Sequence, residues 1–296
     1  MIRFKVVKAS HLLLGFAVIA LAVVIALILF ASPPQRAAES AAQQEAKAVS
    51  AFASNPSELM IEIVRDATPA PSAAPRGSIL IYHTHTHEAY RQVEGDPYVA
   101  VEAWRTTDSE HSVVRVGDAL ANALENLGYA VVHDVTDHEQ DELSTAYERS
   151  LKTLEGYEQT FDLIVDLHRD AYSEGLATAF TDELGREYAQ LMLLVGRGDN
   201  YLPENKPDYE GNLRFAQSVS RHANELIPGI CRNVTVKVGR YNQHMGTRAI
   251  LAEVGHNENT LAQALSSVDC LAKAIDAALS ENNTESLNDL SFSDTP

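Results

Sequence analysis

The sequence predicts an α/β protein with a mostly parallel, twisted sheet flanked by helices on both faces, preceded by one N-terminal transmembrane helix. Three observations support this prediction. Residues 12–31 form an uninterrupted apolar run. From Gly77 onward, apolar runs of strand length alternate with amphipathic runs of helix length. Three of the strand-length runs end in histidine, aspartate or glutamate, as expected where neighbouring parallel strands end beside a ligand.

The apolar run is long enough to cross a membrane. Residues 12–31 carry no charge, and about 20 apolar residues span a hydrocarbon core of roughly 30 Å. Arg3, Lys5 and Lys8 precede the run, so residues 1–11 are expected in the cytoplasm and everything after the run outside it. A cleaved signal peptide is the alternative, although its apolar region usually has only about 7–15 residues. Either interpretation predicts an exported domain.

Composition divides the remaining chain into three parts. Residues 32–76 are rich in Ala, Pro and Ser and predict a linker. Residues 77–281 predict the folded domain, and residues 282–296 a disordered acidic tail. The formal net charge of −18 makes nucleic acid a poor partner. Cys231 and Cys270 are either a structural disulfide or two buried thiols.

Each element of the domain has its own signal. The helix expected over 112–127 places Val113, Leu120 and Leu124 on one face, and Gly128 follows as a stop. The run FDLIVDLH has the composition of a buried parallel strand. The expected strands are 78–83, 129–135, 161–168, 189–196, 233–239 and 248–255, and the other expected helices are 144–155, 211–226 and 258–281.

Residues of metal-ligand type follow three of these strands. His83, His85 and Glu88 come after the first, His168 ends the third, and Glu253 lies near the end of the last. Parallel neighbours would bring all of them to one edge of the sheet. Imidazole and carboxylate groups are the ligands of catalytic zinc, which keeps a position open for water. Zinc lowers the pKa of that water to about 7, and a nearby carboxylate can accept its proton.

Other interpretations of these residues exist. The histidine-rich stretch resembles a surface metal-scavenging tract, but it directly follows a predicted buried strand. His168 alone would be an ordinary polar strand end, and Glu253 could form a structural ion pair with Arg248. No GxSxG elbow is present for nucleophilic catalysis. A glycosidase would need paired carboxylates rather than a histidine cluster. Metal-assisted hydrolysis therefore fits the pattern best.

The ordered motifs resemble a known family. ILIYHTHTHEAY (79–90) is similar to the IYHTHTxE signature of the stage II sporulation protein P family of cell-wall hydrolases, and AEVGHNENT (252–260) to its LxEVGxxxNT. The resemblance runs from about Ser78 to about Ala277. Between these two motifs, the chain carries RTTD (105–108), VVRVGDAL (113–120), DLHRDA (166–171) and YNQ (241–243) in the family's order.

The resemblance implies a fold and an activity. It implies a zinc amidase fold with a Zn²⁺ cofactor, which hydrolyses the amide between the stem peptide and N-acetylmuramic acid of peptidoglycan. It also implies endopeptidase activity on peptide cross-links and a lytic transglycosylase as partner. The expected location is a single-pass membrane protein with its catalytic domain on the extracytoplasmic side.

Carried over residue by residue, the resemblance assigns roles to the candidate residues. His83 or His85 supplies the first zinc ligand and His168 the last, with Glu253 as general base. His85 is preferred over His83 because strand alternation leaves one of them turned away from the metal.

The middle ligand is the open assignment. Glu88 fits the family signature, but in the related amidases this ligand lies further along the chain. Glu102, Glu110 and His111 are therefore rivals.

Two departures from the family pattern and two arginines complete the set of candidates. His87 stands where threonine is usual, and His256 stands where glycine is common. Arg169 and Arg248 are candidates to bind a stem-peptide carboxylate, because a planar guanidinium matches a carboxylate. Two other functions stay open. One is a non-catalytic, membrane-anchored wall-binding scaffold with the same fold. The other is a zinc peptidase acting on proteins, although the chain lacks an HExxH helix.

Overall fold

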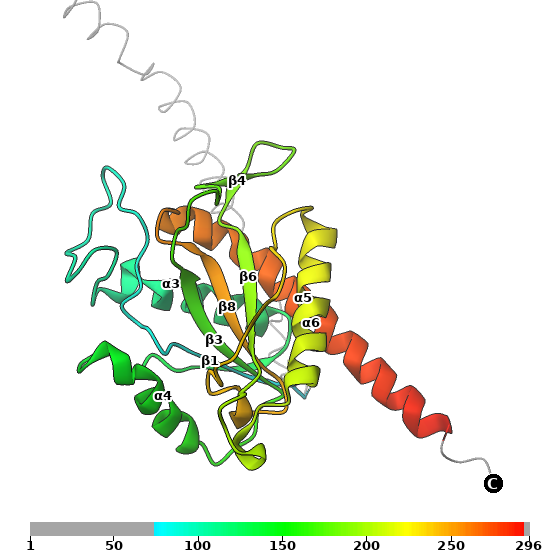
Figure 1. Ribbon diagram of the computed structural model, residues 1–296. Coiled ribbons are helices and arrows are strands. Elements are labelled where there is room, and N and C mark those ends of the chain that lie inside the picture. The colour runs from blue at the N-terminus through cyan, green and yellow to red at the C-terminus, as the bar shows by residue number, and fades with distance from the viewer. Residues whose placement is uncertain (1–73, 293–296) are drawn as a thin grey trace, which may run out of the picture. The chain divides into compact units, whose positions relative to one another are not determined.

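The computed structural model describes residues 74–292, with side chains up to Glu281, and these residues build a sheet with the strand order β2-β1-β3-β8-β6-β7 (Figure 1). Strands β2, β1, β3 and β8 are mutually parallel, so the prediction of a mostly parallel sheet is confirmed. The strands are β1 (Ser78–Tyr82), β2 (Ala130–His133), β3 (Leu163–Asp170), β6 (Leu191–Gly196), β7 (Thr235–Lys237) and β8 (Ala249–His256), and the longer helices are α3 (Val113–Asn126), α4 (Ala146–Glu155), α5 (Tyr209–Leu226) and α6 (Leu261–Phe292).

Two strands run against the others. β6 pairs with β8 in antiparallel register, and β7 is parallel to β6. Parallel strands of one sheet need a crossover connection, usually a helix. Instead, a small antiparallel hairpin, β4 (Phe180–Thr181) with β5 (Glu187–Tyr188), lies between β3 and β6. We did not predict this hairpin, because each of its strands has only two residues.

Helices cover both faces of the sheet, but unequally. Successive residues of a strand point to opposite faces. One set, including Ile79, Leu163 and Ile250, packs with the buried residues of α3, α5 and α6 in the main core. The other set, including Leu80 and Ile164, packs in a smaller cluster with Leu154 of α4 and with Phe161. Within the described residues, α4 is the one long helix that contributes to this second face. The two faces are called the main-core face and the α4 face below.

Helix α3 shows why a predicted element forms. Ser112 caps it by accepting a hydrogen bond from the backbone N–H of Val114. Val116, Leu120 and Leu124 are fully buried on the main-core face. Each such side chain contributes about 1.5–3 kcal/mol through burial, which fixes the helix against the sheet. Gly128, with φ +94°, then turns the chain into β2.

Helix α6 extends further than expected. We predicted a helix over 258–281 followed by a disordered tail, whereas α6 continues to Phe292. No glycine or proline occurs between Glu281 and Phe292 to end a helix. Cys231 and Cys270 are both free and buried.

The predicted membrane span at 12–31 and most of the predicted linker lie outside the described residues. From residue 74 to residue 292, no helix is both long and apolar enough to cross a membrane.

Candidate active site

Four of the predicted site residues meet at the carboxyl ends of β1, β3 and β8. His168 on β3 is the register partner of Glu253 on β8. The ring centroids of His85 and His168 are 5.4 Å apart. Glu88 Oε2 lies 3.3 Å from His168 Nδ1 and also accepts a hydrogen bond from the backbone N–H of Arg169. His85, Glu88, His168 and Glu253 are called the site cluster below.

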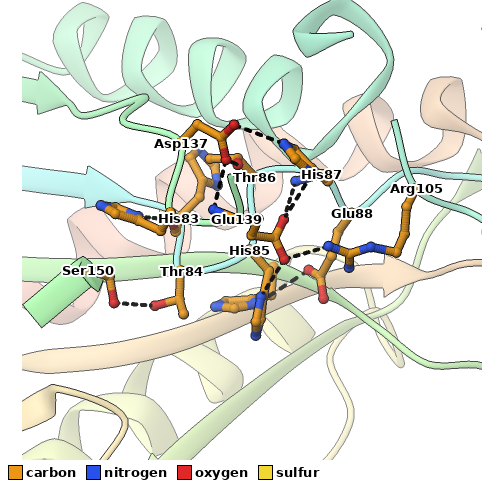
Figure 2. A network of polar contacts seen from close by, with 12 residues as sticks. His83, Thr84, His85, Thr86, His87, Glu88, Arg105, Asp137, Glu139 and Ser150 are labelled. Atoms are coloured by element: carbon orange, nitrogen blue, oxygen red, sulfur yellow. Dashed lines mark hydrogen bonds and ion pairs between the residues drawn. The ribbon is translucent and has the colours of Figure 1, made fainter. Parts of the chain in front are cut away.

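His85 is held by a buried carboxylate from a distant loop. Its Nδ1 lies 2.7 Å from Glu139 Oε1, which accepts but cannot donate, so Nδ1 carries a proton and the lone pair of the neutral ring is on Nε2. The Glu139 side chain is 1% exposed and also accepts hydrogen bonds from Arg105 Nη2 and from the backbone N–H of His87 (Figure 2). These bonds outweigh the effect of burial, which would raise the pKa of Glu139, and lower that pKa to about 2.

His83 lies on the other face of the sheet. It has the same strand parity as Ile79 and Ile81, and it is fully buried on the main-core face. Its Nδ1 donates to the carbonyl of Leu167, and its Nε2 lies 2.8 Å from Nε2 of His133. The structure therefore does not bring His83 to the site cluster. Strand alternation is the wrong reason for preferring His85, because two residues that are two apart in a strand share a face. The two histidines separate because β1 ends at Tyr82, so the chain has left the strand by His85.

His168 lies between two carboxylates. Its Nε2 is 2.8 Å from Asp166 Oδ1 but without hydrogen-bond geometry, so this buried nitrogen has no hydrogen-bond partner. Burial opposes protonation of the ring, but the charges of Asp166 and Glu88 prevail and raise its pKa well above the usual value. The same pairing lowers the pKa of Glu88, against the effect of its burial. The surroundings of His168 thus stabilise a positive charge.

Glu253 lies on the α4 face, and one oxygen of its carboxyl group has no partner. Its Oε2 is buried and has no hydrogen-bond partner in the structure. Burial, reinforced by the nearby charges of Glu88 and Asp170, raises its pKa to about 8, although His168 and Arg169 act in the opposite direction. An unpaired buried carboxyl is costly, and such groups are concentrated at functional sites.

The rivals for the middle ligand lie elsewhere. The Glu102 and Glu110 side chains are 71% and 72% exposed, and they lie nearest to Arg105 and Arg115 respectively. His111 is bonded to two aspartates at the surface. Of the four candidates for this position, the structure brings only Glu88 to the site cluster.

The two predicted carboxylate-binding arginines are differently placed. The guanidinium of Arg169 donates to the backbone carbonyls of Ala89, Asp170 and Trp104, so it holds the loops around the cluster together. Arg248 precedes β8, and its carbonyl accepts from Ile164 near the start of β3. It therefore lies at the opposite end of these strands from the site cluster, and the structure does not bring it to the site.

The two extra histidines have local partners. His87 Nε2 lies 3.1 Å from Asp137 Oδ2 (Figure 2). His256 Nε2 donates to the carbonyl of Ala177, and its ring contacts Tyr172. Both therefore stabilise loops beside the sheet edge, and neither contacts the site cluster in the structure.

The donor chemistry of the site cluster suits zinc, although a ligand sphere is not assembled. Across residues 74–292, no three His, Cys, Asp or Glu side chains are arranged so as to hold a metal ion. Two buried polar atoms without partners, His168 Nε2 and Glu253 Oε2, nevertheless occur on paired residues of neighbouring strands. Loss of the His168 proton would give a cation the lone pair of Nε2, and imidazole and carboxylate are among the usual ligands of zinc.

Sequence reasoning missed several residues of this site. Asp166 carried an available signal, because it is a charge inside an otherwise apolar strand, and its carboxylate accepts from the N–H and hydroxyl of Thr84. Glu139 and Tyr147 gave no such signal, and Arg105 belongs to the RTTD motif, to which the sequence assigned no role. They come from loops and a helix that only the folded chain brings to His85.

Comparisons with known proteins give a consistent result. A family model described as "Stage II sporulation protein P (SpoIIP)" matches residues 30–276. Stage II sporulation protein P of Bacillus subtilis (strain 168) is 27% identical over 210 residues, covering 65% of this chain and 49% of that protein. The chain thus spans about half the length of this curated relative.

Solved structures with similar folds include two amidases. The CwlD amidase from Clostridioides difficile, in complex with the GerS lipoprotein, is 12% identical over 70% of this chain and 98% of that chain, with a TM-score of 0.45. The N-acetylmuramyl-L-alanine amidase Ami1 from Mycobacterium smegmatis is 12% identical over 70% of this chain and 99% of that chain, with a TM-score of 0.43.

Proposed function

The chain belongs to the stage II sporulation protein P family, and we propose that it is a peptidoglycan hydrolase, a zinc-dependent N-acetylmuramoyl-L-alanine amidase that releases the stem peptide from the glycan. The observation that carries this proposal is the meeting of His85, Glu88, His168 and Glu253 at the carboxyl ends of three neighbouring strands. These residues come from motifs of this chain that resemble the family's signatures.

In this proposal, His85, Glu88 and His168 hold the zinc ion. His85 is preferred to His83 because its Nε2 lone pair is free, whereas both nitrogens of His83 have partners. Glu88 is preferred to its rivals because of its position beside His168. When bound, zinc would lower the pKa of a water molecule and polarise the amide carbonyl.

Glu253 would act as the general base. Its Oε2 has no partner to give up before it accepts a proton, and a carboxyl with a raised pKa holds that proton until the leaving nitrogen can take it. The Oε2 atom of Glu253 is buried, which would keep the proton away from bulk solvent. Glu139 and Arg105 would fix the ring of His85, as carboxylates commonly do for metal-binding histidines.

The remaining parts of the proposal concern location and partners. Residues 12–31 would anchor the protein in the membrane, and residues 32–76 would hold residues 77–281 away from it on the extracytoplasmic side. Endopeptidase activity on cross-links and a lytic transglycosylase partner belong to the same proposal. A non-catalytic scaffold is the competing hypothesis.

Digestion of purified peptidoglycan tests the proposal. Full-length protein in mild detergent is incubated with sacculi, with and without a chelator, and the products are identified by mass spectrometry. We expect free stem peptides and peptide-free glycan, lost with the chelator and restored by zinc. Sacculi that stay intact under all conditions would contradict the amidase assignment and favour the scaffold.

A further inference from the structure

A second feature of the α4 face is an aromatic cleft. It has a volume of about 310 Å³ and lies between helix α4 and the loop after β7. Tyr147, Tyr201 and Tyr241 line it together with Arg240, and Glu148 lies on the α4 side. Aromatic walls with few charged groups are typical of ligand sites rather than of ordinary surface hollows. We refer to this feature as the tyrosine cleft.

Arg240 is the cationic group of the tyrosine cleft. Its guanidinium carbon lies 4.3 Å from the centroid of the Tyr201 ring, which holds it against an aromatic face. Its Nε is buried without a hydrogen-bond partner, and among the described side chains it forms no ion pair. By contrast, Arg105 and Arg232 are paired with carboxylates. In a chain with a net charge of −18, an arginine without a carboxylate partner is available for an external anion.

The backbone beside Arg240 is strained. Tyr241 and Asn242 are consecutive non-glycine residues in the left-handed region, with φ +50° and +52°. Each such residue costs of order 1–3 kcal/mol and persists only where its surroundings hold it, often at functional sites. Asn242 Nδ2 donates to the carbonyl of Tyr147 and to Ser150 Oγ, which ties the loop to α4. A Cβ at Gly239 would come within 2.8 Å of the Tyr241 ring, so the loop packs closely around that ring.

The tyrosine cleft adjoins the site cluster through Tyr147, which lines the cleft and contacts His85. The ring of Tyr147 contacts His85 on one side and Tyr241 on the other, with centroid distances of 5.7 Å in both cases. Burial raises the pKa of Tyr241, and the charge of Glu253 adds to this rise, as expected for groups close to one another. A ligand cleaved beside His85 can therefore continue across Tyr147 into the cleft.

We propose that Arg240 and the tyrosine cleft bind a carboxylate of the peptide whose amide bond is cleaved at the site cluster. This inference rests on the proposed function and assigns to Arg240 the role that the sequence suggested for Arg169 and Arg248. Two extended peptide residues reach about 7 Å and three reach about 10 Å. The two ring contacts, of 5.7 Å each, span at most about 11 Å. A carboxylate three residues from the scissile bond therefore comes closest to this span, and a guanidinium can bind it through two hydrogen bonds.

A binding experiment tests the inference without turnover. Full-length Glu253→Gln protein is titrated by calorimetry with N-acetylmuramoyl tripeptide that has free carboxylates, and with the same tripeptide fully amidated. The titrations are repeated with Arg240→Met, Arg240→Lys and Arg214→Met added. Arg214 is an exposed arginine of α5, so its substitution is a matched control for the loss of one positive charge.

We expect the free-carboxylate peptide to bind at least about tenfold more tightly than the amidated peptide, as for a hydrogen-bonded charge pair. Arg240→Met should abolish this difference, Arg240→Lys should keep part of it, and Arg214→Met should keep all of it. Equal affinity for the two peptides, or an unchanged preference in Arg240→Met, would overturn the inference. Equally strong competition by a peptide-free disaccharide would also overturn it, because the cleft would then bind glycan.

The two proposals can fail separately. If sacculi are digested but Arg240→Met changes neither KM nor the preference for free carboxylates, the amidase proposal stands and the role of Arg240 is wrong. If sacculi are not digested, yet the carboxylate preference depends on Arg240, the cleft binds the peptide without the proposed hydrolysis. Circular dichroism and the melting temperature of each variant report whether it is folded.

Discussion

Replacing Glu139 by alanine should both destabilise the protein and weaken its affinity for zinc. The Glu139 side chain is 1% exposed and accepts hydrogen bonds from His85, from Arg105 and from the backbone N–H of His87. Its removal leaves the guanidinium of Arg105, whose side chain is only 15% exposed, beside an empty space. Loss of one partner of a buried ion pair costs about 3–5 kcal/mol. Because Arg105 is partly exposed, we expect a loss of unfolding free energy near the lower end of this range, about 3 kcal/mol. For a domain of this size, that loss corresponds to a fall of about 6–12 °C in melting temperature.

The effect on zinc follows from the orientation of His85. Without Glu139, no carboxylate fixes the proton on Nδ1, and loss of such a partner typically lowers metal affinity about 10–100-fold. Zinc affinity is measured by competition with a chromophoric chelator, and stability by urea denaturation of the metal-free protein. Asp141→Asn is the control, because it removes an exposed charge from the same loop. Zinc affinity within about twofold of the parent in Glu139→Ala would refute the argument, even if the variant is less stable.

Three further predictions concern the base, the surface and the anchor. Glu253→Gln should lower kcat by about 10²–10⁴-fold while zinc affinity, measured by chelator competition, stays within about threefold; loss of zinc would identify Glu253 as a ligand. The pKa of His111 is raised by its bonds to Asp96 and Asp108, so its stabilising contribution is present below pH 6.5 and is lost as the pH rises through the raised pKa. His111→Asn should therefore lower the melting temperature more at pH 5.5 than at pH 8.5. The corresponding loss of unfolding free energy is well under about 1 kcal/mol, and an equal effect at both pH values would exclude a contribution from protonation of His111. Deleting residues 1–31 should move the protein from the membrane fraction to the soluble fraction, and continued sedimentation with membranes would argue against the predicted anchor.

Much of the fold is visible in the sequence because each strand and helix has a local pattern. The run LIVDLH is nearly all apolar because β3 is covered on both faces. The predicted helix 112–127 agrees with α3 to within one residue at each end. The reversed direction of β6 is not visible, because AQLMLLVG reads the same for parallel and antiparallel strands. Direction depends on the connection, and the two-residue strands of the β4–β5 hairpin are too short to recognise from sequence.

The candidate site was predictable only where its residues follow strands. His85, His168 and Glu253 could be named because parallel strands end together, a rule that needs no knowledge of loops. Glu139 and Arg240 lie on loops whose paths depend on tertiary packing. The assignment of Arg248 shows the limit of composition-based reasoning. It precedes β8, so a residue near Glu253 in the sequence lies at the opposite end of the same strand.

The unequal covering of the sheet explains why the site and the tyrosine cleft share one face. Strand parity sends His83 into the main core, where it pairs with His133 and where three helices leave no room for a substrate. The same parity places His168 and Glu253 on the α4 face, which one helix of ten residues covers only in part. The space that remains beside α4 is bounded by the strained loop that carries Tyr241. A substrate that approaches Glu253 along α4 would pass the tyrosine cleft, which is lined by Tyr147 of that helix.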